Sequence, residues 1–437
     1  TLKGWAELAL AAREARAGER RVDEILGAWR ERFPDHPATD QFIDTLAERI
    51  RAALTYPERI AVLLPLSGRL AGPASAIRNG LMAAYYDQPP RVERPEIRIY
   101  DTGEEGIAPT RAYKRAVAAG NDFVIGPLSK EGVSAIARLD SHPVPVLSLN
   151  YRPDQETPVP DALYQFGLLP EDEARQAASA AIQNERHNAV ALVPAGDWGA
   201  RMLDAFRTRY ESLSGAVLDV ARYNSEASDY GRSIKALFQL DHSFQRERRL
   251  ESVLGRKLRF EPRRRQDVEL VFMAAMPRQA RLLEPQLEFH RAGDVPAYAS
   301  SHVYSGSPSP DDDWDLNGLY FTEIPWIVDN LEEPDALYRR VTKHWPGARE
   351  RHNRLYALGI DAFALVPQLE RLARREDAVL AGATGRLSLD ASRRVQRELR
   401  WAKFVKGQPL ALPHPEAELR GPDAPLGRDT RERSEGS

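Results

Sequence analysis

The run Ile60–Leu64 constrains the fold of this chain more than any other stretch of its sequence. Five apolar residues in succession indicate a strand buried on both faces, which is typical of a parallel sheet covered by helices. Pro65 ends this strand, and Ser67 and Gly68 form a small polar turn before a helix that begins near Gly72. Ligands in open α/β sheets bind beyond the carboxyl ends of the strands. The turn is therefore the first candidate for a binding site.

Short apolar runs alternate with helical segments from this strand onward. The expected strands are Ile60–Leu64, Ile97–Tyr100, Phe123–Ile125 and Val144–Leu149. The expected helices between them are Gly72–Tyr86, Thr110–Ala119 and Lys130–Leu139. This alternation predicts a parallel sheet with right-handed crossovers and with Leu64, Val124 and Val146 in its core.

A second set of alternating elements follows a strand-like stretch at residues 164–170. Its expected helices are Glu171–Asn184, Ala200–Leu213, Tyr230–Gln239 and Arg278–His290. Its expected strands are Ala189–Val193, Val217–Tyr223, Val268–Ala274 and Pro296–Ala299, with Val190, Val271 and Phe272 in the core. The fold class is therefore α/β, with two doubly wound lobes and a cleft between them.

The chain divides into three parts by pattern. Residues 1–56 have helical periodicity with a break at 33–37, and residues 413–437 are rich in Pro, Gly and charge, which predicts a disordered tail. Between them, we expect lobe 1 to comprise about 57–167 and 300–383, and lobe 2 about 168–299 and 384–412. Crossings between the lobes are expected near 166–170, 299–302 and 381–387.

Composition excludes several classes of protein. The chain has 437 residues, of which 42% are hydrophobic and 29% charged, and its formal charge is −3. These values fit a soluble globular protein without a nucleic-acid partner. The absence of cysteine excludes disulfides and thiolate metal sites. The chain begins at Thr1 without an apolar leader, so we expect a trimmed chain from which any signal or lipid anchor has been removed.

Catalytic and metal-binding motifs are missing from the sequence. It contains no Gly-x-Ser-x-Gly, His-Glu-x-x-His, Gly-x-x-x-x-Gly-Lys or Gly-x-Gly-x-x-Gly, and its nine histidines do not pair at ligand spacing. The adjacent carboxylates at 104–105 and 311–313 fall in expected loops, and Asp361 is a structural residue as readily as a site residue. A binding or interaction protein without cofactor, metal or catalytic residues is therefore the favoured interpretation.

A basic segment interrupts the second set at residues 245–265, with nine Lys or Arg against three Glu. One interpretation is a solvated surface insertion. The other is a docking surface for an acidic partner, in which Arg248, Arg249 and Lys257 are the candidate contacts.

Two groups of motifs carry a resemblance to known proteins. The elements Ile60–Tyr86, Val124–Ser129 and Val144–Asn150 resemble a type I periplasmic binding protein. The run from Pro262 to Arg281, continued to Tyr304, resembles the LppC/LpoA family, as do Ala76–Gly80 and the stretch from Trp29 to Ala38.

Membership of that family implies an outer-membrane lipoprotein on the periplasmic side, lipid-anchored in its precursor. It also implies that residues 1–56 are the end of a tetratricopeptide-like domain. The implied role is to activate a bifunctional penicillin-binding protein, a peptidoglycan synthase, by direct contact. No catalytic residue is carried over, because the family has none established.

The binding-protein resemblance also implies where a ligand would lie. Transport members of that fold hold the charged groups of an amino acid at three turns. The corresponding residues from lobe 1 are Ser67, Gly68, Ser129, Ser148 and Asn150. Trp198, Tyr230 and Tyr304 are the candidates for closing over a ligand from the other side. The alternatives are that the small residues only permit tight turns and that the aromatic residues pack in the core or hinge.

Three functions remain open at this point. The first is a non-catalytic periplasmic activator of a cell-wall synthase. The second is a periplasmic solute-binding protein for an amino acid or a wall-derived peptide. The third is an enzyme with an unrecognised site.

Overall fold

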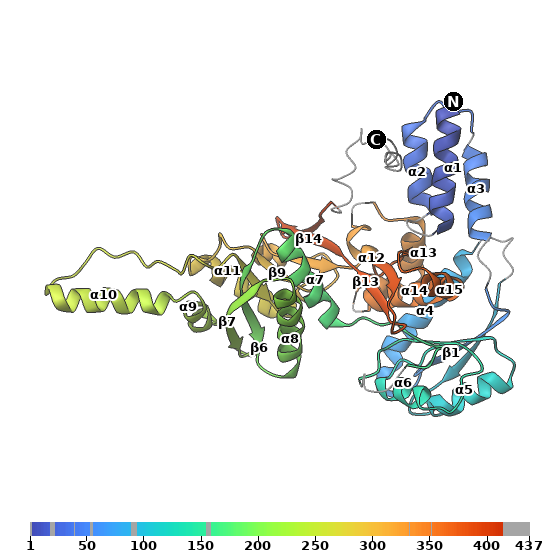
Figure 1. Cartoon of the computed structure of the whole chain (residues 1–437), viewed down its shortest axis with the longest axis horizontal. Helices are drawn as coiled ribbons and strands as arrows, with labels where there is room; N and C mark the ends of the chain where they lie inside the picture. Colours follow the sequence, from blue (N-terminus) through green and yellow to red (C-terminus); the bar gives the residue numbers. More distant parts are fainter. Residues whose placement is uncertain are drawn as a thin grey trace, which may run out of the picture.

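The computed structural model describes residues 2–17, 22–38, 40–52, 56–88, 94–153, 159–331, 333–350 and 352–413. The predicted disordered tail lies outside these ranges except for Pro413. Figure 1 shows the amino-terminal helices on one side of the molecule, the β-containing lobes side by side, and a long helix that projects from the second lobe. Within the described ranges, no helix combines the length and apolar character needed to cross a membrane.

The amino-terminal part is a three-helix unit. Its helices are α1 (Leu2–Ala17), α2 (Val22–Arg32) and α3 (Asp40–Ala52). Leu8, Leu26, Trp29, Ile43 and Ile50 are all at most 5% exposed and form its core, with the Trp29 Nε1 donating to Gly4 O at 3.0 Å. The break at 33–37 separates α2 from α3 as predicted.

Lobe 1 is built on a five-stranded parallel sheet in the order β2-β1-β3-β4-β5. The strands are β1 (Arg59–Leu64), β2 (Glu96–Asp101), β3 (Phe123–Ile125), β4 (Val146–Ser148) and β5 (Leu163–Gln165). The helices of this lobe are α4 (Ala71–Asp87), α5 (Pro109–Ala118) and α6 (Lys130–Ala137). Leu64, Val124 and Val146 are fully buried, which confirms the predicted core.

Lobe 2 is built on a seven-stranded sheet in the order β15-β14-β10-β9-β8-β6-β7. The strands are β6 (Asn188–Pro194), β7 (Ala216–Tyr223), β8 (Leu270–Met273), β9 (Ala297–Ala299), β10 (Tyr320–Glu323), β14 (Arg400–Val405) and β15 (Gln408–Ala411). The helices are α7 (Pro170–Gln183), α8 (Asp197–Ser212), α9 (Gly231–Leu237), α10 (Leu240–Leu254) and α11 (Pro277–Phe289). Val190, Val271 and Phe272 are fully buried, as predicted. The fold class of two doubly wound lobes is confirmed.

The predicted boundary of lobe 1 at residue 300 is wrong. Residues 320–323 form β10, which pairs in parallel with β9 and antiparallel with β14, so the chain stays in lobe 2 until Glu323. Only then does it return to lobe 1, through α12 (Pro325–Val328), α13 (Ala336–His344), α14 (Asn353–Leu365) and α15 (Leu369–Arg374). The sequence did not reveal β10, because its four residues include Thr322 and Glu323 and do not form an apolar run.

The predicted start of the last lobe 2 segment at residue 384 is also wrong. A small antiparallel sheet forms from β11 (Leu380–Ala381), β12 (Arg386–Leu389) and β13 (Val395–Glu398). Gln165 N, at the end of β5, donates to Arg393 O at 2.9 Å and joins this small sheet to lobe 1. Of the strands from β11 onward, β14 and β15 belong to the sheet of lobe 2, whereas β11, β12 and β13 do not.

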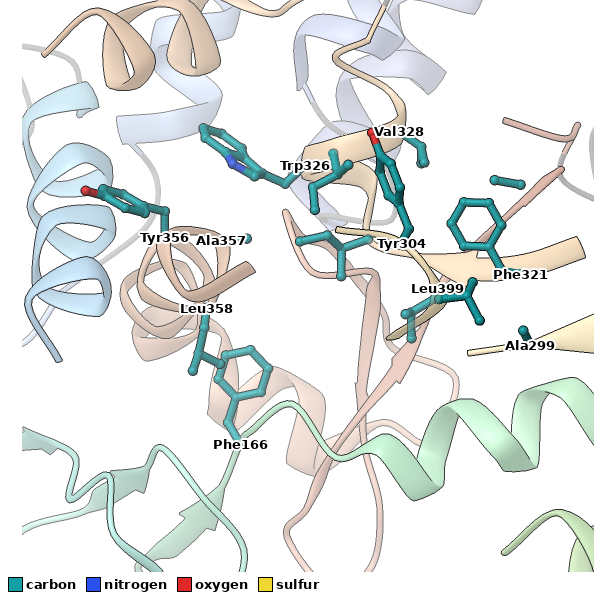
Figure 2. Packing of buried hydrophobic residues seen from close by; sticks show 14 of the residues in the cluster. Phe166, Ala299, Tyr304, Phe321, Trp326, Val328, Tyr356, Ala357, Leu358 and Leu399 are labelled. Carbon is teal, nitrogen blue, oxygen red and sulfur yellow. The ribbon is translucent and has the colours of Figure 1, made fainter. Parts of the chain in front are cut away.

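One apolar core runs through both lobes (Figure 2). It extends from Phe166, just after β5, through Leu358 on α14 to Tyr304 and Phe321 in lobe 2, all at most 2% exposed. A shared core couples the two lobes mechanically, because apolar side chains of one lobe stay buried only while the other lobe keeps its position.

Glu284 on α11 is an acidic residue in an unfavourable environment. Burial raises the pKa of its carboxyl to about 8, and the neighbouring Glu288 adds to the shift. Its Oε2 is enclosed and accepts no hydrogen bond from the described residues. Ionising this group therefore costs free energy in the folded state.

We expect Glu284→Gln to stabilise the protein at pH 8 by roughly 1–3 kcal/mol. The folded-state pKa lies above the unfolded value of 4.5, so stability is lost as the pH rises from that value to about 8. The difference between variant and parent should therefore shrink toward pH 4.5. Urea unfolding at several pH values measures it, and a constant difference across this range would contradict the assignment.

Candidate functional site

At the first two predicted turns of lobe 1, the candidate residues already contact other residues of the protein. Ser67 Oγ accepts a hydrogen bond from Glu105 N at 2.9 Å. Gly68 has a φ of 74°, a left-handed backbone conformation that favours glycine, and the end of the Glu104 side chain lies beside it. Ser129 caps α6, its Oγ accepting from Gly132 N at 3.1 Å.

Ser148 and Asn150, at the end of β4, make hydrogen bonds with the surrounding backbone. Ser148 is fully buried, and its Oγ donates to Asn150 O at 2.8 Å. The Asn150 Nδ2 donates to Leu128 O at 3.0 Å, and its Oδ1 accepts from Tyr151 N at 3.0 Å. These contacts fix the shape of the loop without a ligand. A ligand role for either residue stays a prediction.

The aromatic candidates from the other side lie at different depths. Trp198 is half-buried at the start of α8, with its ring centroid 5.5 Å from that of His302. Tyr230 is 2% exposed, and its hydroxyl donates to Ala227 O at 2.8 Å. Tyr304 is 1% exposed and packs against Phe321. The rings of Tyr230 and Tyr304 thus belong to the apolar core, which agrees with the packing alternative, and a role in closing over a ligand stays a prediction for both.

A buried ionic cluster joins the lobes, and sequence reasoning missed it. Arg354, on α14, forms an ion pair of 2.5 Å with Glu323 at the end of β10. The same guanidinium donates to Ser301 O at 3.0 Å and to Tyr304 O at 3.1 Å. Because α14 packs along α4 in lobe 1 while the acceptors belong to lobe 2, Arg354 connects the two lobes directly.

Glu173, on α7, anchors the other side of this cluster. Its carboxylate accepts from Ser301 N at 2.7 Å and from Ser301 Oγ at 3.1 Å. Burial raises the pKa of the Glu323 carboxyl, while Arg354 acts in the opposite direction. Burial lowers the pKa of the adjacent His302 imidazole, and Glu173 counteracts it. The sequence offered no signal for this cluster, because residues 320–323 do not form an apolar run and nothing marks Arg354 as the partner of Glu323.

Asp361 has a structural role in lobe 1. This carboxylate on α14 accepts from Ala383 N at 2.6 Å and from Thr384 N at 2.7 Å. Burial raises the pKa of the Asp361 carboxyl to about 6, although these hydrogen bonds act to lower that pKa. The contacts hold the turn between β11 and β12 against α14, so the structural alternative accounts for this residue.

The basic segment forms an arm, which we define as residues 240–265. Its first half is α10, and the chain returns beside it after Gly255. The base is anchored by Phe244 and Phe260, whose ring centroids are 5.7 Å apart, and by Arg263 N, which donates to Ser243 Oγ at 3.1 Å. Arg248, Arg249 and Lys257, the predicted partner contacts, are all exposed.

The described residues contain no group of three or more His, Asp or Glu side chains arranged to hold a metal ion.

Comparison with known proteins identifies the family. The family described as "LppC putative lipoprotein" matches residues 1–407. The chain belongs to the LppC family. The curated protein "Penicillin-binding protein activator LpoA" of Photobacterium profundum is 31% identical over 410 residues, which cover 92% of the chain and 65% of that relative. The chain therefore spans slightly less than two thirds of the relative's length.

Solved structures agree with this assignment at the level of the fold. The LpoA C-domain from Haemophilus influenzae, described as a regulator of PBP1A, has 24% identity and a TM-score of 0.63, and the match covers 81% of the chain and 99% of that domain. A protein from Chromobacterium violaceum described as a "putative branched-chain amino acid ABC transporter" has 26% identity and a TM-score of 0.58, and the match covers 79% of the chain and 99% of that protein. The LppC chain thus has the predicted two-lobed periplasmic-binding-protein architecture.

Proposed function

We propose that this LppC-family chain is a non-catalytic activator of a bifunctional penicillin-binding protein, which it stimulates by direct contact. The observation that carries the proposal is the match over 92% of the chain to a relative named as such an activator. The C-domain neighbour, described as a regulator of PBP1A, supports the same role for the two-lobed part. We further propose a periplasmic location, with a lipid anchor in the outer membrane in the precursor.

An activator of this kind needs a higher affinity for the active state of the synthase than for its inactive state. No bond-making chemistry is required of the activator itself. The cluster around Arg354 supports the proposal, since its direct contacts between the lobes favour one arrangement of the surface that a partner meets. The contacts made by Ser148 and Asn150 favour this role over solute binding, because those side chains already have protein partners.

A purified polymerisation assay tests the proposal. We expect this chain to bind a bifunctional synthase of its own organism and to raise its rates of glycan polymerisation and peptide cross-linking. The chain alone should consume no lipid-linked wall precursor. An inactivated synthase, with its polymerase and transpeptidase residues substituted, is the control for turnover by the chain. Absence of both binding and stimulation with every bifunctional synthase of that organism would overturn the proposal.

A further inference from the structure

The arm is the part of lobe 2 that extends furthest from the rest of the molecule. Figure 1 shows α10 projecting from the sheet of lobe 2, on the side opposite to the amino-terminal helices. Of the residues in α10, only Leu240 and Ser243 are buried, and both lie at its base. We define the arm tip as residues 246–259. A segment held in this position is open to another molecule from several directions.

The tip carries an apolar stripe that no part of the described chain covers. Leu250 is 52% exposed, Val253 77% and Leu254 52%. Their spacing of three and four residues places them on one face of α10. Exposed aliphatic residues gathered in this way on a helix that projects into solvent indicate a contact surface.

The tip is also strongly basic. Residues 246–259 contain six Lys or Arg and two Glu, which gives the tip a formal charge of +4 in a chain whose net charge is −3. The cations are Arg246, Arg248, Arg249, Arg256, Lys257 and Arg259. Arg246 and Arg249 precede Leu250 and Val253 by four residues each, so they extend the same face of the helix.

These cations differ from those at the base of the arm. Arg264 pairs with Asp294 at 2.5 Å and Arg265 with Asp267 at 2.7 Å, so these two charges at the base are neutralised within the protein. For the six cations of the tip, the described part of the chain supplies no carboxylate within 4.0 Å. These cations can therefore pair with the carboxylates of an acidic partner without first breaking an ion pair within the protein.

We propose that the arm tip is the docking surface for an acidic segment of a partner protein, with carboxylates for the cations and apolar side chains for the stripe. This inference rests on the proposed function in one respect: the partner that carries the segment is the synthase. A membrane surface fits less well. The stripe has three aliphatic residues and the tip has no aromatic residue, so the apolar face is much shorter than that of helices that lie in a lipid interface.

The first test compares two matched triple variants for binding to the synthase. The tip variant combines Arg248→Glu, Arg249→Glu and Lys257→Glu. The control combines Arg111→Glu, Lys114→Glu and Arg115→Glu, which reverses three exposed cations on α5 of lobe 1. We expect the tip variant to associate with the synthase at least ~10-fold more slowly than the unaltered chain at low salt, and its association rate to lose its dependence on salt. The control variant should show neither change. Circular dichroism verifies that both variants fold.

A second variant tests the apolar stripe. Leu250→Ser combined with Val253→Ser should raise the dissociation rate about 10-fold with little change in association, because lost apolar contact acts on the lifetime of the complex. Unchanged binding by both the charge variant and the serine variant would overturn the docking role of the arm. Since the unaltered chain would still bind and stimulate in that case, this failure is distinct from failure of the proposed function.

A peptide probe tests the surface without the synthase. A fluorescein-labelled peptide of alternating Leu and Glu residues should bind the unaltered chain at least ~10-fold more tightly than the tip variant, as measured by anisotropy. Equal affinity for the two chains would overturn the inference. Vesicles containing phosphatidylglycerol serve as the competing surface. Binding to vesicles that the tip variant loses, with synthase binding unaffected, would assign the arm to a membrane instead and would also overturn the inference.

Discussion

Replacing Arg354 with Met will lower the free energy of unfolding by about 3–5 kcal/mol, because it leaves the buried Glu323 carboxylate without a counter-charge. Glu323 is fully buried, and the guanidinium supplies its only ion pair within the described residues. The Met side chain fills much of the same space, so the loss is electrostatic rather than a cavity effect. Urea unfolding at pH 7 measures the change.

Two further variants separate this effect from general damage. Arg374→Met removes an exposed pair with Glu370, whose side chains are 78% and 81% exposed, and should cost less than about 0.5 kcal/mol. The double variant Arg354→Met, Glu323→Gln should recover part of the loss, since it also removes the unpaired charge. If the single and double variants were equally destabilised, the ion pair would not be the cause.

The pH dependence of the Arg354→Met variant gives an independent check. Without Arg354, burial and the nearby charge of Glu173 raise the pKa of Glu323, and only the hydrogen bond from Ile324 N opposes them, so its folded-state pKa rises further above the unfolded value. A raised pKa contributes stability that is present at low pH and is lost as the pH rises. The deficit of the variant relative to the parent should therefore shrink between pH 7 and pH 5.

Gly359→Ala will destabilise the protein by about 2–3 kcal/mol, although alanine is the better helix former by about 1 kcal/mol. Gly359 lies where α14 crosses α4, and a Cβ there would be 2.0 Å from Ile77 O. The reciprocal contact is equally close: a Cβ on Gly80 would be 2.0 Å from Tyr356 O. Backbone atoms cannot rotate away, so the two helices must separate.

Gly27→Ala is the matched control for this prediction. Gly27 lies within α2, and a Cβ at this position would have no neighbouring atom of the described chain within 4 Å, so an added methyl meets open space. Alanine should there stabilise the helical unit by up to about 1 kcal/mol. Thermal unfolding followed by circular dichroism measures both variants. A destabilisation by Gly27→Ala as large as that by Gly359→Ala would refute the steric explanation.

The sequence predicted those elements whose burial does not depend on distant partners. A strand covered by helices on both faces needs a continuous apolar run, and Ile60–Leu64 and Leu270–Met273 both have one. The sequence also predicted that the cations of the arm are exposed, because a dense run of like charges cannot be buried. These cations include Arg248, Arg249 and Lys257. These features are local properties of the chain.

The tertiary structure alone decided which polar residues are buried and how the lobes are joined. Glu323 can end a buried strand only because Arg354, from a helix 31 residues later, reaches it across the junction. Ser148 and Tyr230 have side chains suited to a ligand, and in the fold their hydroxyl groups donate to backbone carbonyl oxygens. The physical reason is the same in each case: the free energy of burying a polar group depends on which partners the fold brings within hydrogen-bond distance, and sequence spacing does not specify that distance.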